Sequence, residues 1–184
     1  MTATAAPFGL RPVRHLSGGE IRTQAFPKGV DDGSTATFYL GQPLKWTSGY
    51  LVAASAGDTT IAGVFAGCQY IDTASTRFHA VQFAASYAGV STTKDVLIHM
   101  WVDPNIIFQI QASTAAAITA RGQYADFTSS GGNAITGDSA ISLGTLGAGI
   151  ANLLVLDRME IPDNDWGTGY PIVEVVFAEH LLIR

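Results

Sequence analysis

The stretch DVLIHMWVDPNIIFQIQA (Asp95–Ala112) decides the fold class. Two runs rich in isoleucine, valine and aromatic residues flank the triplet Asp103-Pro104-Asn105. Runs of this composition, bounded by turn residues, are typical of β-strands. Proline presets the backbone φ angle, and Asp and Asn side chains accept local backbone hydrogen bonds. The stretch therefore predicts two strands joined by a turn at residues 103–105.

Similar short runs lie on both sides of this stretch, separated by turn signals such as Ser48-Gly49 and Gly57-Asp58. The expected strands lie within residues 35–40, 43–48, 50–55, 59–71, 76–87, 95–102, 105–112, 151–161 and 171–182. No fixed-period repeat is present. Many short strands with a turn about every ten residues predict a mainly β fold, a small antiparallel barrel or sandwich.

One segment has the pattern of a helix. In STAAAITAR (Ser113–Arg121), Ser113 can cap the first turn, alanine favours the interior, and Gly122 can end the helix. The sequence therefore predicts one short helix here. Residues 128–149 are rich in Gly, Ser, Thr and Ala and predict a long loop with a short ordered piece.

The first 35 residues differ from the rest in composition. Their proline and glycine residues are Pro7, Gly9, Pro12, Gly18, Gly19, Pro27, Gly29 and Gly33. This density opposes regular helix and strand, whereas apolar residues recur throughout the segment. We therefore expect an extended N-terminal arm at 1–35, packed on its own body or on a neighbouring subunit, and a β-rich domain at 36–184.

The charge content is low and unevenly distributed. Charged residues make up 14% of the chain and hydrophobic residues 47%, whereas a typical soluble domain has about 25% charged residues. Such a surface favours contact with another protein, although a hydroxyl-rich β surface that is merely soluble is the alternative. The net charge of −5 argues against a nucleic-acid binder. Residues 1–30 carry four cations against one acid, a balance of +3 that leaves −8 for the remainder, which suits an arm lying on an acidic neighbour.

Cysteine content and hydropathy limit where the protein folds. A single cysteine, Cys68, excludes an internal disulfide and predicts folding in a reducing cytoplasm. The N-terminus lacks the pattern of a signal peptide. No run approaches about 18 apolar residues, so the sequence predicts no membrane-spanning helix.

Sequence motifs for catalysis are missing. The chain has no phosphate-binding loop, dinucleotide fingerprint, zinc-protease motif or nucleophile elbow. Cys68 lies in an apolar strand, where a buried thiol is the usual interpretation. The four histidines, His15, His79, His99 and His180, are scattered along the chain. We therefore expect a protein that is not an enzyme and holds no metal or cofactor.

The segment DNDWGTGYPIVE (Asp163–Glu174) has acids at positions one, three and twelve, as a calcium loop does. It lacks the glycine at position six and is flanked by predicted strands, so it is interpreted as an ordinary loop. The carboxylates of Asp126, Asp138, Asp157 and Glu160 show no paired spacing for acid–base chemistry. Trp46 and Trp101 are predicted to be core residues, whereas Trp166 and Tyr170, in the glycine-containing loop, are predicted surface contacts.

Several stretches together resemble a family of proteins. They are APFGLRPVRHLSGGEIR (6–22), GVFAGCQYID (63–72), DPNIIFQIQA (103–112), ADF (125–127) and PDNDWG (162–167) with VEVVFAEH (173–180). These stretches resemble small virion proteins of tailed bacteriophages, taken to be head decoration, or cement, proteins. The resemblance spans about Pro7 to His180. Residues 41–67 are also similar in pattern to the small β domain of lambda-type decoration proteins.

The resemblance implies a structural virion protein, made in the bacterial host cytoplasm, that binds the outer surface of a phage capsid. It would stabilise the capsid by bridging neighbouring major capsid protein subunits, as a homotrimer at threefold or quasi-threefold positions, without nucleic acid, membrane or cofactor. Phe8, Arg11, Arg14 and Arg22 in the arm are then the expected capsid contacts.

Three other functions remain open from the sequence. One is a tail-tube or head–tail connector component, which would also be β-rich and multimeric. A glycan-binding β domain would use Trp166 and Tyr170 as a stacking surface. An enzyme ranks last, because no nucleophile–base pair or metal set emerges.

Overall fold

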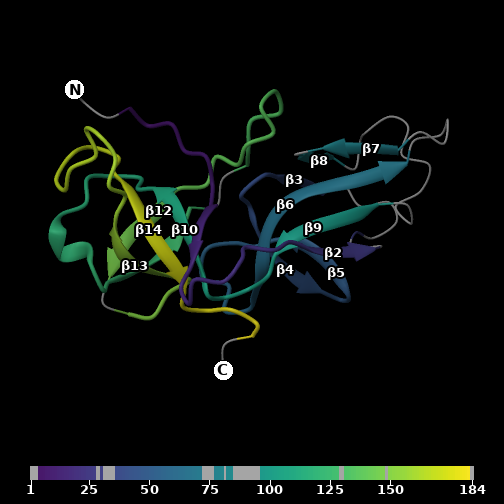
Figure 1. Ribbon diagram of the computed structural model, residues 1–184, viewed down its shortest axis with the longest axis horizontal. Helices are drawn as coiled ribbons and strands as arrows, with labels where there is room; N and C mark the ends of the chain where they lie inside the picture. The colour runs from purple at the N-terminus through teal and green to yellow at the C-terminus, as the bar shows by residue number, and fades with distance from the viewer. Residues whose placement is uncertain are drawn as a thin grey trace.

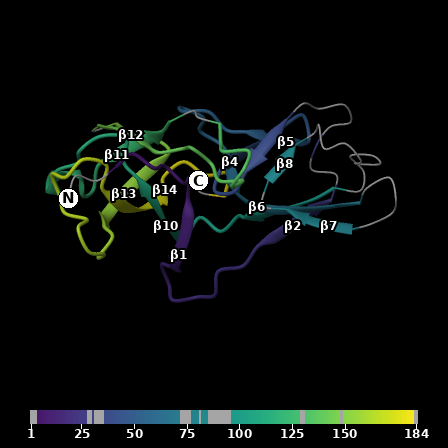
Figure 2. The ribbon, with the colours of Figure 1, turned by 90° about the horizontal axis from the view of Figure 1, so that it is seen from above.

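The computed structural model describes residues 4–27, 30, 36–71, 77–80, 82–84, 96–128, 131–147 and 149–182. It is mainly β, with 49% strand and 2% helix. Two large antiparallel sheets lie at opposite ends of an elongated molecule (Figures 1 and 2). Within the described ranges no barrel closes, so the sandwich is the predicted architecture that agrees with the structure.

The first sheet lies at the end of the molecule that carries the N-terminus (Figure 1). Its strand order is β1 (Arg11–His15), β10 (Ile106–Gln111), β14 (Ile172–Phe177), β13 (Leu153–Arg158), β11 (Tyr124–Phe127) and β12 (Leu143–Gly147). All neighbouring strands are antiparallel. Alternate residues of β14 are buried, which is the pattern of a sheet with one face on the core.

The second sheet is formed by residues from the first part of the chain. Its strand order is β2 (Gln24–Pro27), β9 (Leu97–Trp101), β6 (Ile61–Ile71), β4 (Pro43–Thr47) and β5 (Tyr50–Ala53), with β7 (Arg77–Ala80) paired to β6. A separate pair joins β3 (Thr37–Tyr39) to β8 (Gln82–Ala84). The first sheet therefore consists of β1 and the C-terminal strands, and the second sheet is inserted between them.

The predicted strands on both sides of Asp103-Pro104-Asn105 are confirmed as β9 and β10, with a turn at residues 104–105. They do not pair with each other, because β9 belongs to the second sheet and β10 to the first. The triplet is thus the point at which the chain passes from one sheet to the other.

Each sheet has its own core cluster. In the first, Phe108 and Phe177 meet edge to face with ring centroids 5.6 Å apart, and in the second Phe38 and Phe65 lie 5.9 Å apart. Ile61 and other apolar residues of the inserted segment belong to the first cluster. The two halves are therefore joined by packing as well as by the chain.

One glycine is required where β6 pairs with β9. Gly63 has φ +153°, and a Cβ atom there would lie 2.5 Å from the carbonyl oxygen of Trp101. A side chain at this position would push the two strands apart, so the close pairing depends on glycine.

The helix predicted over Ser113–Arg121 is wrong in extent: only Ile118–Ala120 is helical, as a 3₁₀ turn. The preceding backbone is committed elsewhere, because Ser113 N–H donates to the Leu143 carbonyl and the Ala116 carbonyl accepts from Gly167 N–H. A nine-residue alanine-rich segment is too short for helix propensity to outweigh these tertiary bonds. In the part of the chain that the structure describes, no helix is long and apolar enough to cross a membrane.

The segment expected as an arm contains two of the strands. β1 is an edge strand of the first sheet and β2 an edge strand of the second, and the connection between them runs along the outside of the molecule (Figure 2). Leu10 is fully buried. The edge position accommodates Pro12, since an edge residue needs no N–H on its open side. Residues 28, 29 and 31–35 of the segment lie outside the described residues.

Candidate interaction surface

The buried cysteine Cys68 is held as an unreactive thiol. Burial raises the pKa of the Cys68 thiol to about 12, and its Sγ lies 3.5 Å from the carbonyl oxygen of Gln82. Because the thiolate is the nucleophile, such a cysteine is inert at neutral pH. Among the described residues, no group of three or more His, Cys, Asp or Glu side chains is placed to hold a metal ion.

Three side chains join the end of β1 to the crossover between the sheets. His15 Nε2 lies 2.9 Å from Asp103 Oδ2, and Ser17 Oγ lies 2.9 Å from His15 Nδ1. The backbone N–H of Ser17 donates to the same Nδ1, so the serine–histidine contact belongs to a local turn. Backbone hydrogen bonding from Asn105, followed by the His15 bond, lowers the pKa of Asp103. The three residues therefore hold the junction together.

The loop that carries the predicted contacts Trp166 and Tyr170 spans residues 159–171 in the structure and is organised by one buried amide. Asn164 Nδ2 donates to the carbonyls of Met159 and Ile172, and its Oδ1 accepts from Ile172 N–H, each at 2.8 Å. Arg158 Nη1 donates to the Asn164 carbonyl at 2.8 Å. These hydrogen bonds hold the loop backbone in one conformation, so the loop is ordered and not flexible.

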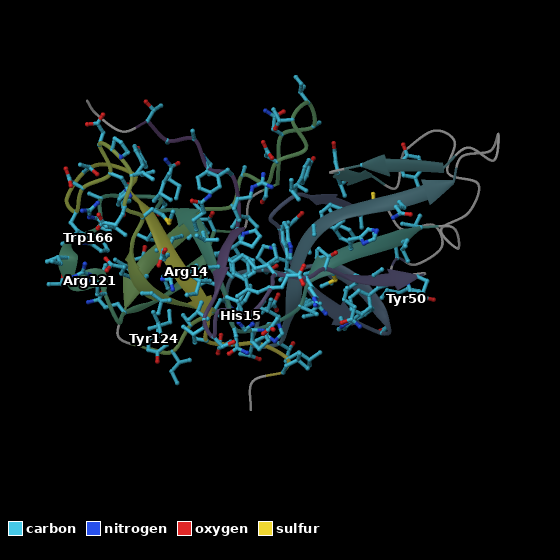
Figure 3. All side chains as sticks on the ribbon, in the orientation of Figure 1. Arg14, His15, Tyr50, Arg121, Tyr124 and Trp166 are labelled. Atoms are coloured by element: carbon cyan, nitrogen blue, oxygen red, sulfur yellow. The ribbon has the colours of Figure 1, made fainter. Side chains whose placement is uncertain are left out.

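Trp166, in the middle of this loop, is half-buried and packs against the first core cluster. The Arg121 guanidinium lies 5.8 Å from the ring centroid, and Figure 3 labels the two residues next to each other. Arg121 also pairs with Asp157. The Nε1 atom of Trp166 is buried and has no hydrogen-bond partner among the described residues. The ring therefore offers a sugar or a partner only part of its surface. Tyr170 is also half-buried, with a left-handed φ of +57°.

The four predicted arm contacts differ in exposure. Phe8 is half-buried, and Arg11 is half-buried and paired with Asp138. Arg14, whose side chain is 53% exposed, pairs with Glu174. Arg22 is 81% exposed and pairs with Glu20 at 2.9 Å. Arg14 and Arg22 are thus the members of the set that remain accessible to a partner.

The first described residues lie along the first sheet. Ala6 N–H donates to Gln111 Oε1 at 2.7 Å, and Gln111 Nε2 donates to the Thr4 carbonyl at 3.1 Å. Gly9 N–H donates to the Ile141 carbonyl at 3.1 Å. Residues 4–6 are exposed, yet their backbone is already fixed to the body.

Residues 128–149 are predicted as a long loop with a short ordered piece, and within them the structure has strand β12 and a hairpin at residues 131–139, called here the tip hairpin. It projects from the body between the two sheets as the green loop of Figure 1. Asn133 N–H donates to the Asp138 carbonyl and Gly137 N–H to the Asn133 carbonyl, both at 2.8 Å. Asn133 followed by a lone isoleucine and Gly137 was the available signal for a turn with an apolar residue at its tip.

Comparison of the chain with models of protein families, with curated proteins and with solved structures gives no match.

Proposed function

We propose that the chain is a structural protein of a tailed-bacteriophage virion, which binds the outer surface of the capsid and bridges neighbouring major capsid subunits. The supporting observation is the set of large apolar side chains exposed on separate loops, turns and one strand end. Its members are Leu16, Tyr50, Ile118, Ile135, Ile150, Ile161, Leu181 and Leu182.

These side chains come from loops and turns, from the first residue of β5 and from the C-terminal segment. Single exposed apolar residues are normal on a protein surface. Here they occur on a chain with only 14% charged residues, which leaves little charge to keep the surface solvated. A protein that bridges several neighbours needs contacts on several sides, and many weak contacts made together give strong attachment.

The proposal is tested by co-sedimentation of the purified chain with expanded phage heads that lack it, counting copies bound per particle. Saturation at hundreds of copies supports a decoration protein. Binding of about a dozen copies at one vertex would instead indicate a connector or tail component, since such rings have low fixed symmetry. Absence of binding would refute the proposal.

The arm contacts are tested with Arg22→Ala, because the Arg22 guanidinium is exposed and pairs only locally. Weaker head binding with a smaller dependence on salt is expected if this cation faces an acidic capsid surface. Arg121→Ala is the matched control, since Arg121 is also exposed and ion-paired but lies at the Trp166 loop. Deletion of the whole arm, residues 1–28, cannot test the arm contacts, because it also removes the strands β1 and β2 and the buried Leu10 and would disturb the fold.

A further inference from the structure

We infer that the tip hairpin is a preformed anchor whose Ile135 side chain inserts into an uncharged apolar pocket of a neighbouring capsid subunit. The inference rests on the proposed function and adds to it the contact residue and the chemistry of the partner site. Ile135 is 96% exposed, the highest value among the large exposed hydrophobic residues.

The tip is held in shape by hydrogen bonds of its own residues. Asn133 Oδ1 accepts from the backbone N–H groups of Ile135 and Thr136, at 2.8 and 3.3 Å. Thr136 Oγ1 accepts from Asp138 N–H at 3.3 Å. Because these bonds fix the backbone on both sides of Ile135, little conformational entropy remains to be lost when the tip binds.

The base of the hairpin is clamped by both halves of the molecule. Leu40 N–H donates to the Gly137 carbonyl at 2.8 Å, and Ser139 N–H donates to the Leu40 carbonyl at 3.0 Å. From the other side, Arg11 pairs with Asp138. The hairpin is therefore a rigid projection whose base is held from two sides.

The charge of the tip identifies the kind of partner. Residues 131–137, GGNAITG, carry no charge, and the nearby Asp138 carboxylate is occupied by Arg11. Nucleic-acid binding needs clustered cations, and membrane attachment needs more apolar area than one isoleucine supplies. A small apolar pocket in a protein fits a single rigid aliphatic side chain surrounded by neutral groups.

The test measures the dissociation constant for phage heads by co-sedimentation at increasing protein concentration. Ile135→Ala is expected to weaken binding about 10- to 50-fold, since it removes three buried carbons, and Ile135→Asp at least as much. Asn133→Ala leaves Ile135 in place but releases the tip, so a smaller loss is expected. Ile150→Ala is the comparison: Ile150 is 74% exposed on another loop and belongs to the same exposed set, so its alanine variant should weaken binding by less than Ile135→Ala does.

Circular dichroism and thermal unfolding show that each variant remains folded, which the exposure of both isoleucines favours. If wild-type protein binds heads and Ile135→Ala binds equally well, the inference is wrong while the proposed function stands. Equal losses for the Ile135 and Ile150 variants would also overturn it, since they would indicate nonspecific apolar adhesion. Ile135-dependent self-association without heads, seen by sedimentation velocity, would assign the pocket to a second copy of this chain and refute a capsid pocket. Failure of the wild-type protein to bind heads refutes the proposed function first, and the inferred pocket with it.

Discussion

Replacing Asn164 by alanine tests whether one amide holds the loop at 159–171. The substitution removes three hydrogen bonds from a residue that is 6% exposed. The Met159 and Ile172 carbonyls keep second donors, Ile161 N–H and Met159 N–H, both at 3.0 Å. Only Ile172 N–H is left without its acceptor.

The expected loss of stability depends on which groups keep a hydrogen-bond partner after the substitution. A buried donor without a partner costs about 1–3 kcal/mol, and each of the two other lost bonds adds about 0.5 kcal/mol or slightly more. The free energy of unfolding should therefore fall by about 2–4 kcal/mol, which for a chain of 184 residues lowers Tm by about 5–12 °C.

Urea denaturation followed by tryptophan fluorescence measures this change, because Trp166 lies in the same loop. Asn133→Ala is the control: Asn133 also accepts backbone N–H groups, but in an exposed turn where water replaces it. A loss below about 0.5 kcal/mol for Asn164→Ala would refute the reasoning, since it would mean that water or a shifted backbone satisfies Ile172 N–H.

Three further predictions concern buried positions. Burial lowers the pKa of His180 below its ordinary value of 6.5 and outweighs the negative charge of Asp103, which acts to raise it. The imidazole is therefore neutral in the folded protein at a pH where the unfolded chain would bind a proton. The free energy of unfolding should thus decrease as the pH falls below about 6.5, and His180→Gln should reduce that decrease in urea denaturation between pH about 7.5 and about 5.5. Cys68 should react with a thiol reagent at pH about 8 only after unfolding, because burial raises its pKa to about 12; rapid labelling of the folded protein would contradict this. Gly63→Ala should cost about 1–3 kcal/mol or prevent folding, since its Cβ would meet a β9 carbonyl, whereas Gly149→Ala, with open space around it, should leave thermal unfolding nearly unchanged.

The local pattern of hydrophobic residues was sufficient to predict where strands form, but not which strands pair with each other. The runs that became β9 and β10 are rich in β-branched residues, and their hydrophobic pattern needs no knowledge of the rest of the fold. Which strand lies beside which is decided by backbone hydrogen bonds and by packing between distant segments. Residues 103–105 therefore predicted a turn correctly, without indicating that it joins two different sheets.

The candidate surface was predicted in part for similar reasons. Glycine and acidic residues indicated the loop that carries Trp166, but the burial of that ring depends on the core and on Arg121, which lie far away in sequence. Arg11 was expected to be a free contact, and only the fold brings Asp138 beside it. The strands β1 and β2 were not predicted, because each contains a proline, which argues against a strand in general but is tolerated in an edge strand.

The insertion of one sheet between the strands of the other has a consequence for synthesis. When the ribosome has made residues up to Trp101, every strand of the second sheet exists, and that sheet can form as the chain emerges. Arg11–His15 was made first, yet its neighbour Ile106–Gln111 comes about ninety residues later. A nascent chain that pauses after Trp101 would therefore carry a finished half and an unpaired first strand. We expect this strand, although first out of the ribosome, to pair only after the second sheet has been made.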